Sequence, residues 1–436
     1  MRIVVAHNRY REAQPSGENT MVDSEIAQLT AAGVEVLPFI RSSDEIPSMS
    51  KAAKALLPIS PIWAPRAQQD LSRLLTEHRP DVLHLHNPYP LISPWVVRTA
   101  HRHGVPVVQT VHNYRQVCSS GIYFRDGVIC QDCKGRALGV PAIKHRCYRD
   151  STAQSALMAT TLAVHRGTWR SVDRYIALTT AIADHLRDYG ISDDRIVVKP
   201  NAVPDPGRPA PLGDGFLYMA RLSPEKGVEL LLDAWRRHPV GTLGTLRVAG
   251  DGELRPLVEA AAAERPDVVY LGQLDRVGVR AAVEASAVVI AASMWHDVLP
   301  TVIIEALASG RPVLGTALGG IPYLVGADAP HEPAGTGPAE TASAVVGGGG
   351  PVTPAGIGLG EAGWVVAPEP AALAAALPVA RAGASGLTLA ARARYERTFH
   401  PDVVTKQLID IYAGMARTPR PAKPPHLAGR RCPGRS

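Results

Sequence analysis

Short runs of valine, isoleucine and leucine recur along the whole chain, each separated from the next by a segment long enough for a helix. In the first half they lie at residues 2–6, 34–39, 81–86, 105–111, 174–178 and 195–200, and in the second at 215–222, 244–250, 268–274, 287–293, 311–316 and 363–368. Continuous apolar runs are typical of strands buried on both faces, and their alternation with helices is typical of parallel sheets. The pattern predicts an α/β fold.

A stretch rich in proline and glycine, residues 200–215, interrupts this pattern near the middle of the chain. At 436 residues the chain is also too long for one ordinary core. We therefore expect two doubly wound, Rossmann-like domains facing a cleft, with residues 1–203 in the first domain, 204–214 in the linker and 215–393 in the second. A helix over residues 394–416 is expected to pack back toward the first domain.

Two further stretches lack the periodicity of a folded core. Residues 327–360 are rich in glycine, proline and alanine, which predicts a flexible surface insertion in the second domain. Residues 417–436 hold six lysines or arginines and no acid, which predicts a disordered basic tail.

The charge of the chain is unevenly distributed. The formal net charge is +6, with 25 basic and 19 acidic groups in residues 1–210 against 15 and 21 in residues 211–416. A basic first half and tail predict peripheral contact with an anionic membrane, although a solvated surface explains the charge equally well. We expect no nucleic-acid partner, because the second half is acidic and the excess charge lies in the tail.

The start of the chain, residues 1–8, has neither the charged beginning nor the apolar core of a signal peptide. It predicts a first buried strand instead. The apolar runs are shorter than the ~20 residues that a membrane-spanning helix needs. We therefore expect a cytoplasmic protein, in contact with the inner face of the cell membrane at most peripherally.

Junctions between strands and helices in the second half carry residues suited to a phosphate-bearing ligand. Arg221 and Lys226 flank a tight turn at a predicted helix start, where two cations are unfavourable unless an anion lies between them. Two ordinary surface cations would explain the segment equally well. Gly250, Asp251 and Gly252 follow the next predicted strand, and glycines permit close approach of the backbone to a ligand. Gly-Asp-Gly is also an ordinary turn.

A third junction lies within WHDVLPTVIIEALASGRPV, residues 295–313, where Asp297 and Glu305 stand on either side of a predicted helix start. Taken alone, Asp297 would cap the helix and Glu305 would be a surface charge. The backbone N–H groups of residues 301–303 are predicted to be free for an anion, and a carboxylate suits the vicinal hydroxyls of a ribose. The convergence of three such junctions at one sheet edge favours a ligand site.

These segments resemble the two-domain, metal-independent retaining glycosyltransferases that use nucleotide sugars, in particular glycosyltransferase family 4, which has the GT-B fold. The resemblance rests on ARLSPEKG, AGDGELRP and WHDVLPTVIIEALASGRPVLGTALGGIP in the second half, and on HNRYREAQPSGEN and QTVHNYR in the first. It covers nearly the whole chain apart from the linker, the insertion and the tail. It implies that the second domain binds the donor and the first receives the acceptor.

The resemblance also implies roles for single residues. Arg221 and Lys226 would hold the donor phosphates and Glu305 the ribose, while Asp297, where the family usually has glutamate, would contact hydroxyls of the transferred sugar. His112, just after a predicted strand, would face that sugar, whereas an isolated histidine would more often be structural. The further donor contacts would come from Gly17 in a loop before a helix that begins near Asn19, and from Gly250, Asp251, Gly252, Leu299, Pro300, Thr301 and Val302.

The implied function is transfer of a hexose-type sugar from a nucleoside diphosphate sugar to a glycan or lipid-linked acceptor in cell-envelope or polysaccharide biosynthesis. No metal cofactor would be required for catalysis, since positioning and stabilisation of the departing diphosphate would come from the protein. One alternative is a non-catalytic nucleotide-sugar-binding homologue, which is favoured by the side chain of Asp297 being shorter than the usual glutamate. Another is a nucleotide-sugar 2-epimerase. The charge distribution weakens a third alternative, a zinc-stabilised nucleic-acid binder.

Four of the five cysteines lie within residues 113–150. One C-x-x-C pair with two outlying thiols can surround a tetrahedral zinc, and we favour structural zinc over unmetallated cysteines, the ligands being Cys118, Cys130, Cys133 and Cys147. Disulfides are less plausible in a cytoplasmic protein. A similar insert in a subset of the family suggests a shared unit that shapes the acceptor site. His84 and His86, on one face of a predicted strand, are interpreted as polar residues at the sheet edge rather than metal ligands.

Overall fold

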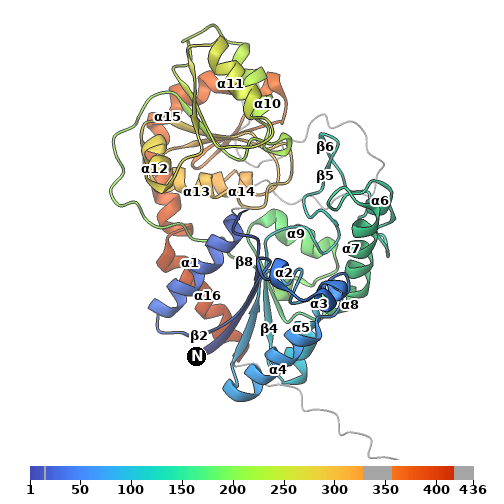
Figure 1. Ribbon diagram of the computed structural model, residues 1–436. Helices are drawn as coiled ribbons and strands as arrows, with labels where there is room; N and C mark the ends of the chain where they lie inside the picture. Colours follow the sequence, from blue (N-terminus) through green and yellow to red (C-terminus); the bar gives the residue numbers. More distant parts are fainter. Residues whose placement is uncertain (14–15, 328–355, 417–436) are drawn as a thin grey trace, which may run out of the picture.

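The computed structural model describes residues 1–13, 16–327 and 356–416 (Figure 1). A first sheet has the strand order β2-β1-β3-β4-β7-β8, and all of its pairings are parallel. Its strands are β1 Arg2–Arg9, β2 Glu35–Ser42, β3 Val82–Leu85, β4 Val107–Val111, β7 Arg174–Ala177 and β8 Ile196–Val198. Its helices are α1 Gly17–Ala31, α2 Glu45–Ser48, α3 Lys51–Leu56, α4 Pro65–His78, α5 Trp95–Arg102, α6 Val140–Lys144, α7 Thr152–Val164, α8 Arg166–Arg170 and α9 Thr180–Asp188.

The second sheet has the order β11-β10-β9-β12-β13-β15-β14, in which only the β14–β15 pairing is antiparallel. Its strands are β9 Phe216–Met219, β10 Leu246–Ala249, β11 Val268–Gly272, β12 Val288–Ala291, β13 Val313–Thr316, β14 Gly358–Gly360 and β15 Gly363–Val366. Its helices are α10 Val228–Arg236, α11 Arg255–Glu264, α12 Arg276–Glu284, α13 Thr301–Ala308, α14 Ile321–Val325 and α15 Pro370–Thr398. The predicted α/β class is confirmed.

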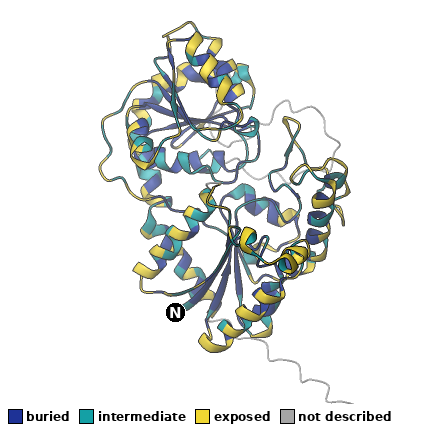
Figure 2. Cartoon of the chain, viewed as in Figure 1, coloured by how far each residue is buried: buried dark blue, intermediate teal, exposed yellow. Residues whose placement is uncertain are grey.

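Apolar side chains on both faces of each sheet form the cores. In the first sheet, Val4 packs on one face with α4 and α5, and Ile3 packs on the other with α1 and the C-terminal helix α16 Pro401–Ala416. The second sheet likewise has one core cluster on each face. Figure 2 shows strands buried beneath helices whose outer surfaces are exposed. The continuous apolar runs of the sequence therefore correspond to strands covered on both sides.

The chain passes from β8 to β9 through residues 199–215, where no helix or strand forms. After the second sheet, α15 extends to Thr398, so the expected start of the last helix at residue 394 lies inside α15. Helix α16 follows and contacts α1 and β3 of the first sheet. The side chain of Thr405 on α16 donates a hydrogen bond to Gln28 Oε1 on α1 at 3.1 Å.

The expected flexible insertion, residues 327–360, and the expected tail, 417–436, lie largely or wholly outside the described residues. The last part of the insertion is described, and there Gly358–Gly360 forms strand β14 against β15 rather than irregular surface chain.

One helical stretch, Pro370–Ala416, contains a window with a mean hydropathy of 1.3, long and apolar enough by composition alone to cross a membrane. The window is 33% buried, and α15 contributes Leu373, Leu377 and Ala380 to the core of the second sheet. Core helices of soluble proteins pass the same test, so this composition is weak evidence for a membrane span.

Candidate active site

The second sheet changes its winding direction between β9 and β12, because the chain moves outward from β9 to β10 on one side and from β12 to β13 on the other. In doubly wound sheets, ligands bind at the carboxyl ends of the strands at such a point. The residues that follow β9 form a 3₁₀ turn at Pro224–Lys226, and Glu225 O accepts a hydrogen bond from Met294 N at 2.9 Å. The two segments therefore meet at the sheet edge.

Gly227 makes this contact possible. It has a φ of +74°, and a Cβ there would lie 1.8 Å from the carbonyl oxygen of Ala292. No side chain larger than hydrogen fits such an approach. The close contact holds the turn that carries Lys226 against the segment that leads to Asp297.

Lys226 and Asp297 form an ion pair across this edge. Lys226 Nζ lies 2.5 Å from Asp297 Oδ2 and 5.1 Å from the centre of the Trp295 ring. Ser293 Oγ also donates a hydrogen bond to Asp297 Oδ2 at 3.2 Å. The Asp297 side chain is nearly buried, at 7% exposure, against 22% for Lys226. The residue expected to hold the donor phosphates and the residue expected to contact the sugar are thus bonded to each other.

The Gly-Asp-Gly turn packs on the neighbouring turn. A Cβ at Gly250 would lie 1.9 Å from Ala220 O, and one at Gly252 would lie 2.4 Å from Leu222 O. Asp251 itself is exposed, as is Arg221 on the adjacent turn. The close approach expected from the glycines is therefore made to protein backbone, and it brings the turn after β10 next to the one that carries Arg221.

Helix α13 begins after Pro300, next to Asp297 in the sequence. The N–H of Ile303 donates to Pro300 O at 3.1 Å, so the expectation of a free N–H at residue 303 is wrong. Within the described part of the chain, the N–H groups of Thr301 and Val302 have no carbonyl partner. They supply the positive end of the helix, which favours an anion.

Glu305 lies one turn into α13 and is partly buried. Among the described residues its carboxylate has no hydrogen-bond or ion-pair partner, although Arg276 is near enough to lower its pKa. Burial outweighs that effect and raises the pKa of Glu305 to about 7. An unpaired acceptor at this depth is suited to hydroxyl donors from a ligand.

The loop at residues 295–299 joins the two halves of the molecule. Trp295 and Val298 pack into the core of the first sheet, and Thr179 Oγ1 donates to Val298 O at 3.2 Å. The ring of His296 lies 6.5 Å from that of Tyr114, which follows β4. Asp297 is near enough that its charge, together with burial, raises the pKa of Tyr114. The segment after β4 therefore meets the segment that carries Asp297.

His112 also follows β4 and is partly buried. Its Nε2 lies 3.0 Å from Nδ1 of His86, and burial lowers the pKa of His112 well below its ordinary value. His84 and His86 lie on one face of β3 and its extension, with ring centres 4.2 Å apart. Both are buried, and Glu25 on α1 lies beside them. The sequence analysis did not identify Glu25 or its partner Lys199. The one available signal was that Lys199 directly follows the apolar run of β8, Ile196–Val198.

Helix α1 begins at Gly17, two residues earlier than expected, because Ser16 takes the extended conformation of a cap. The preceding residues 14–15 lie outside the described part of the chain. A Cβ at Gly17 would meet nothing within 4 Å, so its surroundings are open. Asn19 accepts hydrogen bonds from Tyr10 N at 3.2 Å and contacts His7 Nε2 at 3.0 Å, which fixes the start of the helix beside β1.

The cysteine segment contains a short hairpin, β5 Phe124–Arg125 and β6 Val128–Ile129, and the helix α6. Its four cysteines, Cys118, Cys130, Cys133 and Cys147, are half-buried and form no disulfide. In the described residues, no three of their sulfur atoms lie within 4.8 Å of one another. Burial raises the pKa values of Cys130, Cys133 and Cys147. The thiols thus do not form a closed set of ligands, and zinc stays a prediction.

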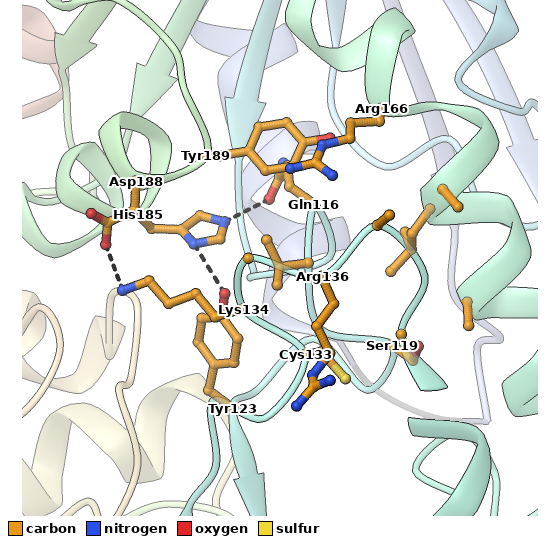
Figure 3. Close-up of a pocket in the computed structure, with 17 residues that line it drawn as sticks. Gln116, Ser119, Tyr123, Cys133, Lys134, Arg136, Arg166, His185, Asp188 and Tyr189 are labelled. Atoms are coloured by element: carbon orange, nitrogen blue, oxygen red, sulfur yellow. Dashed lines mark hydrogen bonds and ion pairs between the residues drawn. The ribbon is translucent and has the colours of Figure 1, made fainter. Parts of the chain in front are cut away.

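A cavity of about 60 Å³ lies between this segment and α9 (Figure 3). Lys134 and Asp188 form an ion pair at 2.7 Å on its wall. His185 joins Gln116, at 3.2 Å, to the hydroxyl of Tyr123, at 3.4 Å. Cys133 of the segment also lines the cavity, and the ring of Tyr114, which follows β4, lies 5.0 Å from that of His185.

Comparisons with known proteins identify two domains in the chain. The model of the glycosyl transferase 4-like domain matches residues 16–202, and that of the glycosyl transferases group 1 matches residues 213–348. The chain therefore contains a glycosyl transferase 4-like domain followed by a glycosyl transferases group 1 domain. Anabaena HepE in complex with UDP has 16% identity and a TM-score of 0.61, covering 95% of this chain and 100% of that one. The sucrose-phosphate synthase of Thermosynechococcus elongatus has 18% identity and a TM-score of 0.63, covering 95% and 98%. These similarities confirm two Rossmann-like domains in the GT-B arrangement.

Among curated proteins, the chain is similar to the phosphatidyl-myo-inositol mannosyltransferase of Mycobacterium leprae, with 25% identity over 273 residues. The alignment covers 59% of this chain and 60% of the mannosyltransferase. An uncharacterized glycosyltransferase of Methanocaldococcus jannaschii is 28% identical over 113 residues, which cover 25% of this chain and 29% of that protein. The chain thus aligns with less than two thirds of each relative's length.

Proposed function

We propose that this protein is a retaining glycosyltransferase that moves a hexose-type sugar from a nucleoside diphosphate sugar to a glycan or lipid-linked acceptor. The observation that carries the proposal is the Lys226–Asp297 pair at the winding reversal of the second sheet, beside the start of α13. A cation, two backbone N–H groups and a partly buried carboxylate there match the phosphates, sugar and ribose of such a donor.

In this proposal the diphosphate takes Lys226 away from Asp297. The ammonium and Arg221 would then stabilise the departing phosphate, together with the N–H groups of Thr301 and Val302. Asp297, freed from the pair, accepts hydrogen bonds from hydroxyls of the sugar. Glu305 accepts from the ribose. Lys226, Arg221 and the start of α13 supply the positive charge that the departing phosphate needs, so no metal cofactor is required.

The proposed chemistry is a front-face displacement. The oxygen of the departing diphosphate takes the proton of the acceptor hydroxyl while the sugar passes through an oxocarbenium-like state. The protein contributes position and charge stabilisation rather than a covalent nucleophile. His112 would contact the sugar from the first domain, near the segment that Tyr114 and His296 bring together.

UDP is the first nucleotide to test, because the structurally similar Anabaena HepE binds UDP and UDP-glucose. The mannosyltransferase relative and a structurally similar lipopolysaccharide outer core galactosyltransferase, WaaB, make hexoses and envelope glycolipids the first substrates to try. The basic first half favours work at the inner, cytoplasmic face of an anionic membrane.

A non-catalytic nucleotide-sugar-binding homologue is the second candidate. Asp297 has a shorter side chain than the glutamate usual at this position, and its carboxylate is engaged by Lys226. The two candidates differ in turnover. Asp297→Glu would raise the rate of a weak enzyme or change its donor preference, whereas neither Asp297→Glu nor Asp297→Ala would change the rate of a protein without turnover.

The direct test measures binding and slow hydrolysis of a panel of nucleotide sugars by wild-type protein, Lys226→Ala and Glu305→Ala. The matched control is Arg236→Ala, an exposed cation at the far end of α10 that pairs with Asp233. We expect hydrolysis by the wild type and by the control, and its loss in the other two variants. If no donor binds, or if both site variants behave as wild type, the proposed function is wrong.

A further inference from the structure

A chain of buried polar side chains lies behind His112. It comprises Glu25 on α1, His84 and His86 on β3 and its extension, Lys199 after β8, and Tyr412 on α16. Lys199, His84 and Tyr412 are almost completely buried, at 1%, 0% and 0% exposure. Charged and polar groups at that depth are costly unless they satisfy one another.

Glu25 is the centre of the network. Its Oε1 lies 3.2 Å from His84 Nδ1 and 3.2 Å from His86 Nε2, and its Oε2 lies 3.3 Å from Lys199 Nζ. Burial alone would raise the pKa of Glu25, but the Lys199 ammonium and the imidazoles hold it well below its ordinary value. Glu25 is therefore a carboxylate, and Lys199 supplies its counter-charge.

His86 and His112 are neutral. Burial lowers the pKa of His86 to about 4 and that of His112 well below its ordinary value. A neutral imidazole carries one N–H and one lone pair, so each ring can donate from one nitrogen only. The nitrogen that donates is set by the partner that the ring faces.

The contacts select one arrangement of protons. A carboxylate can only accept, so His86 Nε2, which faces Glu25 Oε1, carries the proton. The 3.2 Å contact falls short of hydrogen-bond geometry, but among the described residues neither of these two buried atoms has a hydrogen-bond partner, so each is the group at hand to satisfy the other. His86 Nδ1 is then an acceptor, and His112 Nε2 donates to it at 3.0 Å. This leaves Nδ1 of His112 as a lone pair.

We propose that Glu25 is a positioning residue that fixes, through His86, the tautomer and orientation of His112. His112 Nδ1 is thereby held as a hydrogen-bond acceptor for a hydroxyl of the transferred sugar. The inference rests on the proposed function, in which His112 contacts the transferred sugar. It adds the carboxylate of α1 and the lysine after β8 to the parts that this contact requires.

Glu25, His84 and His86 also form the one group of three potential metal ligands within 4.8 Å in the described part of the chain. Three contacts favour the network over a metal. Lys199 already neutralises the carboxylate, Tyr412 OH lies 2.6 Å from His84 Nδ1, and His112 takes the other nitrogen of His86. A cation would be repelled by the buried ammonium.

The first experiment reads the tautomers. Long-range proton–nitrogen spectra of histidine-labelled protein, assigned with His86→Gln and His112→Gln, report which ring nitrogen is protonated. We expect both rings as Nε2–H tautomers in the wild type and a changed or mixed state for His112 in Glu25→Gln. An Nδ1–H tautomer for His112 in the wild type, or an unchanged spectrum in Glu25→Gln, overturns the proposal. So does a stoichiometric metal ion in the purified protein.

The second experiment is a double-mutant cycle on donor hydrolysis. We expect Glu25→Gln to lower kcat on the order of 10- to 100-fold, as when a reacting group loses its position, with little change in the donor KM. In a His112→Gln background the same change should have almost no further effect. An equal loss in both backgrounds would assign Glu25 a merely structural role.

Two further variants separate folding from positioning. Glu25→Gln leaves the Lys199 ammonium unpaired, so Glu25→Gln with Lys199→Met removes both buried charges together and should show the same changed tautomer. Glu25→Asp should restore part of kcat. The matched control is Asp23→Asn, an exposed acid on the same helix that pairs with Arg9. If the wild type hydrolyses no donor, the proposed function fails, while the tautomer spectra still test the network.

Discussion

The two sheets present opposite kinds of edge to the site. At the first sheet, His84, His86 and Lys199 are buried and lie against the carboxylate of Glu25. At the second sheet, Arg221 is exposed and Glu305 has no partner in the described chain. Lys226 has only Asp297 as a replaceable counter-charge. The first edge therefore pairs its charges within the protein, whereas the second edge is arranged for charge that a ligand brings.

The largest expected effect is at the second edge. Lys226→Ala removes the cation that would stabilise the departing diphosphate, so we expect donor hydrolysis to fall about 10²- to 10³-fold. It also leaves Asp297 buried without its counter-charge, so thermal stability should fall. Steady-state kinetics and thermal unfolding measure the two effects. Lys226→Arg, which keeps the charge, is expected to lose less activity, and an equal loss in both variants would contradict a role of the charge.

The next largest effect is expected on stability, at the backbone contact between the turns of the second edge. Gly250→Ala places a Cβ 1.9 Å from Ala220 O, so we expect a loss of about 2 kcal/mol or more in the free energy of unfolding. Gly386 in α15 meets nothing within 4 Å, and Gly386→Ala is expected to stabilise by about 0.5–1 kcal/mol. Denaturant unfolding of both variants checks this, and equal stabilities would contradict the packing described for the Gly-Asp-Gly turn.

The pH dependence of donor binding separates the two edges further. Glu305 has a pKa of about 7, so it gains its charge between pH 6 and 8, while His86 and His112 stay neutral there. We expect donor affinity to fall by about tenfold from pH 8 to pH 6 and to become flat in Glu305→Gln. Titration calorimetry across this range measures it. A pH profile that survives in Glu305→Gln would assign the dependence to another group.

The same shift predicts the sign of a stability change. The pKa of Glu305 is higher in the folded than in the unfolded state, so its stabilising contribution is full below about pH 4.5 and is lost as the pH rises through 7. Glu305→Gln should therefore unfold at a higher temperature than wild type at pH 8. The comparison is made with wild type at each pH, because Glu18 also has a pKa raised to about 7.

The smallest expected effect lies at the far side of the first edge. Tyr412→Phe removes a hydroxyl that lies 2.6 Å from His84 Nδ1, so we expect about 1 kcal/mol of lost stability. Its effect on kcat should be smaller than that of Glu25→Gln, because among the described residues the His84 ring contacts Thr110 and Tyr412 and makes no hydrogen bond to His112. A larger kcat loss in Tyr412→Phe than in Glu25→Gln would contradict the proposal that Glu25, rather than Tyr412, positions His112.

Much of the fold was predictable, because short apolar runs that alternate with helix-length segments are typical of strands buried on both faces of a parallel sheet. The three junctions of the second half were also predictable, since glycines and charges after a strand mark the carboxyl edge of a sheet. The pairing of Lys226 with Asp297 was not, because it joins residues 71 positions apart through a loop conformation. The position of Glu25 beside His84 and His86 was not predictable either, because the sequence of α1 does not indicate which face of the helix packs on β3.

The direct test of the central claim is release of nucleoside diphosphate from nucleotide sugars, with the anomer of the released sugar followed by proton NMR, in the presence of a metal chelator. The account predicts release by the wild type with retention of the anomeric configuration, and its near loss in Lys226→Ala. Inversion of the anomer, release that stops when metal is removed, or a Lys226→Ala protein as active as wild type would contradict it.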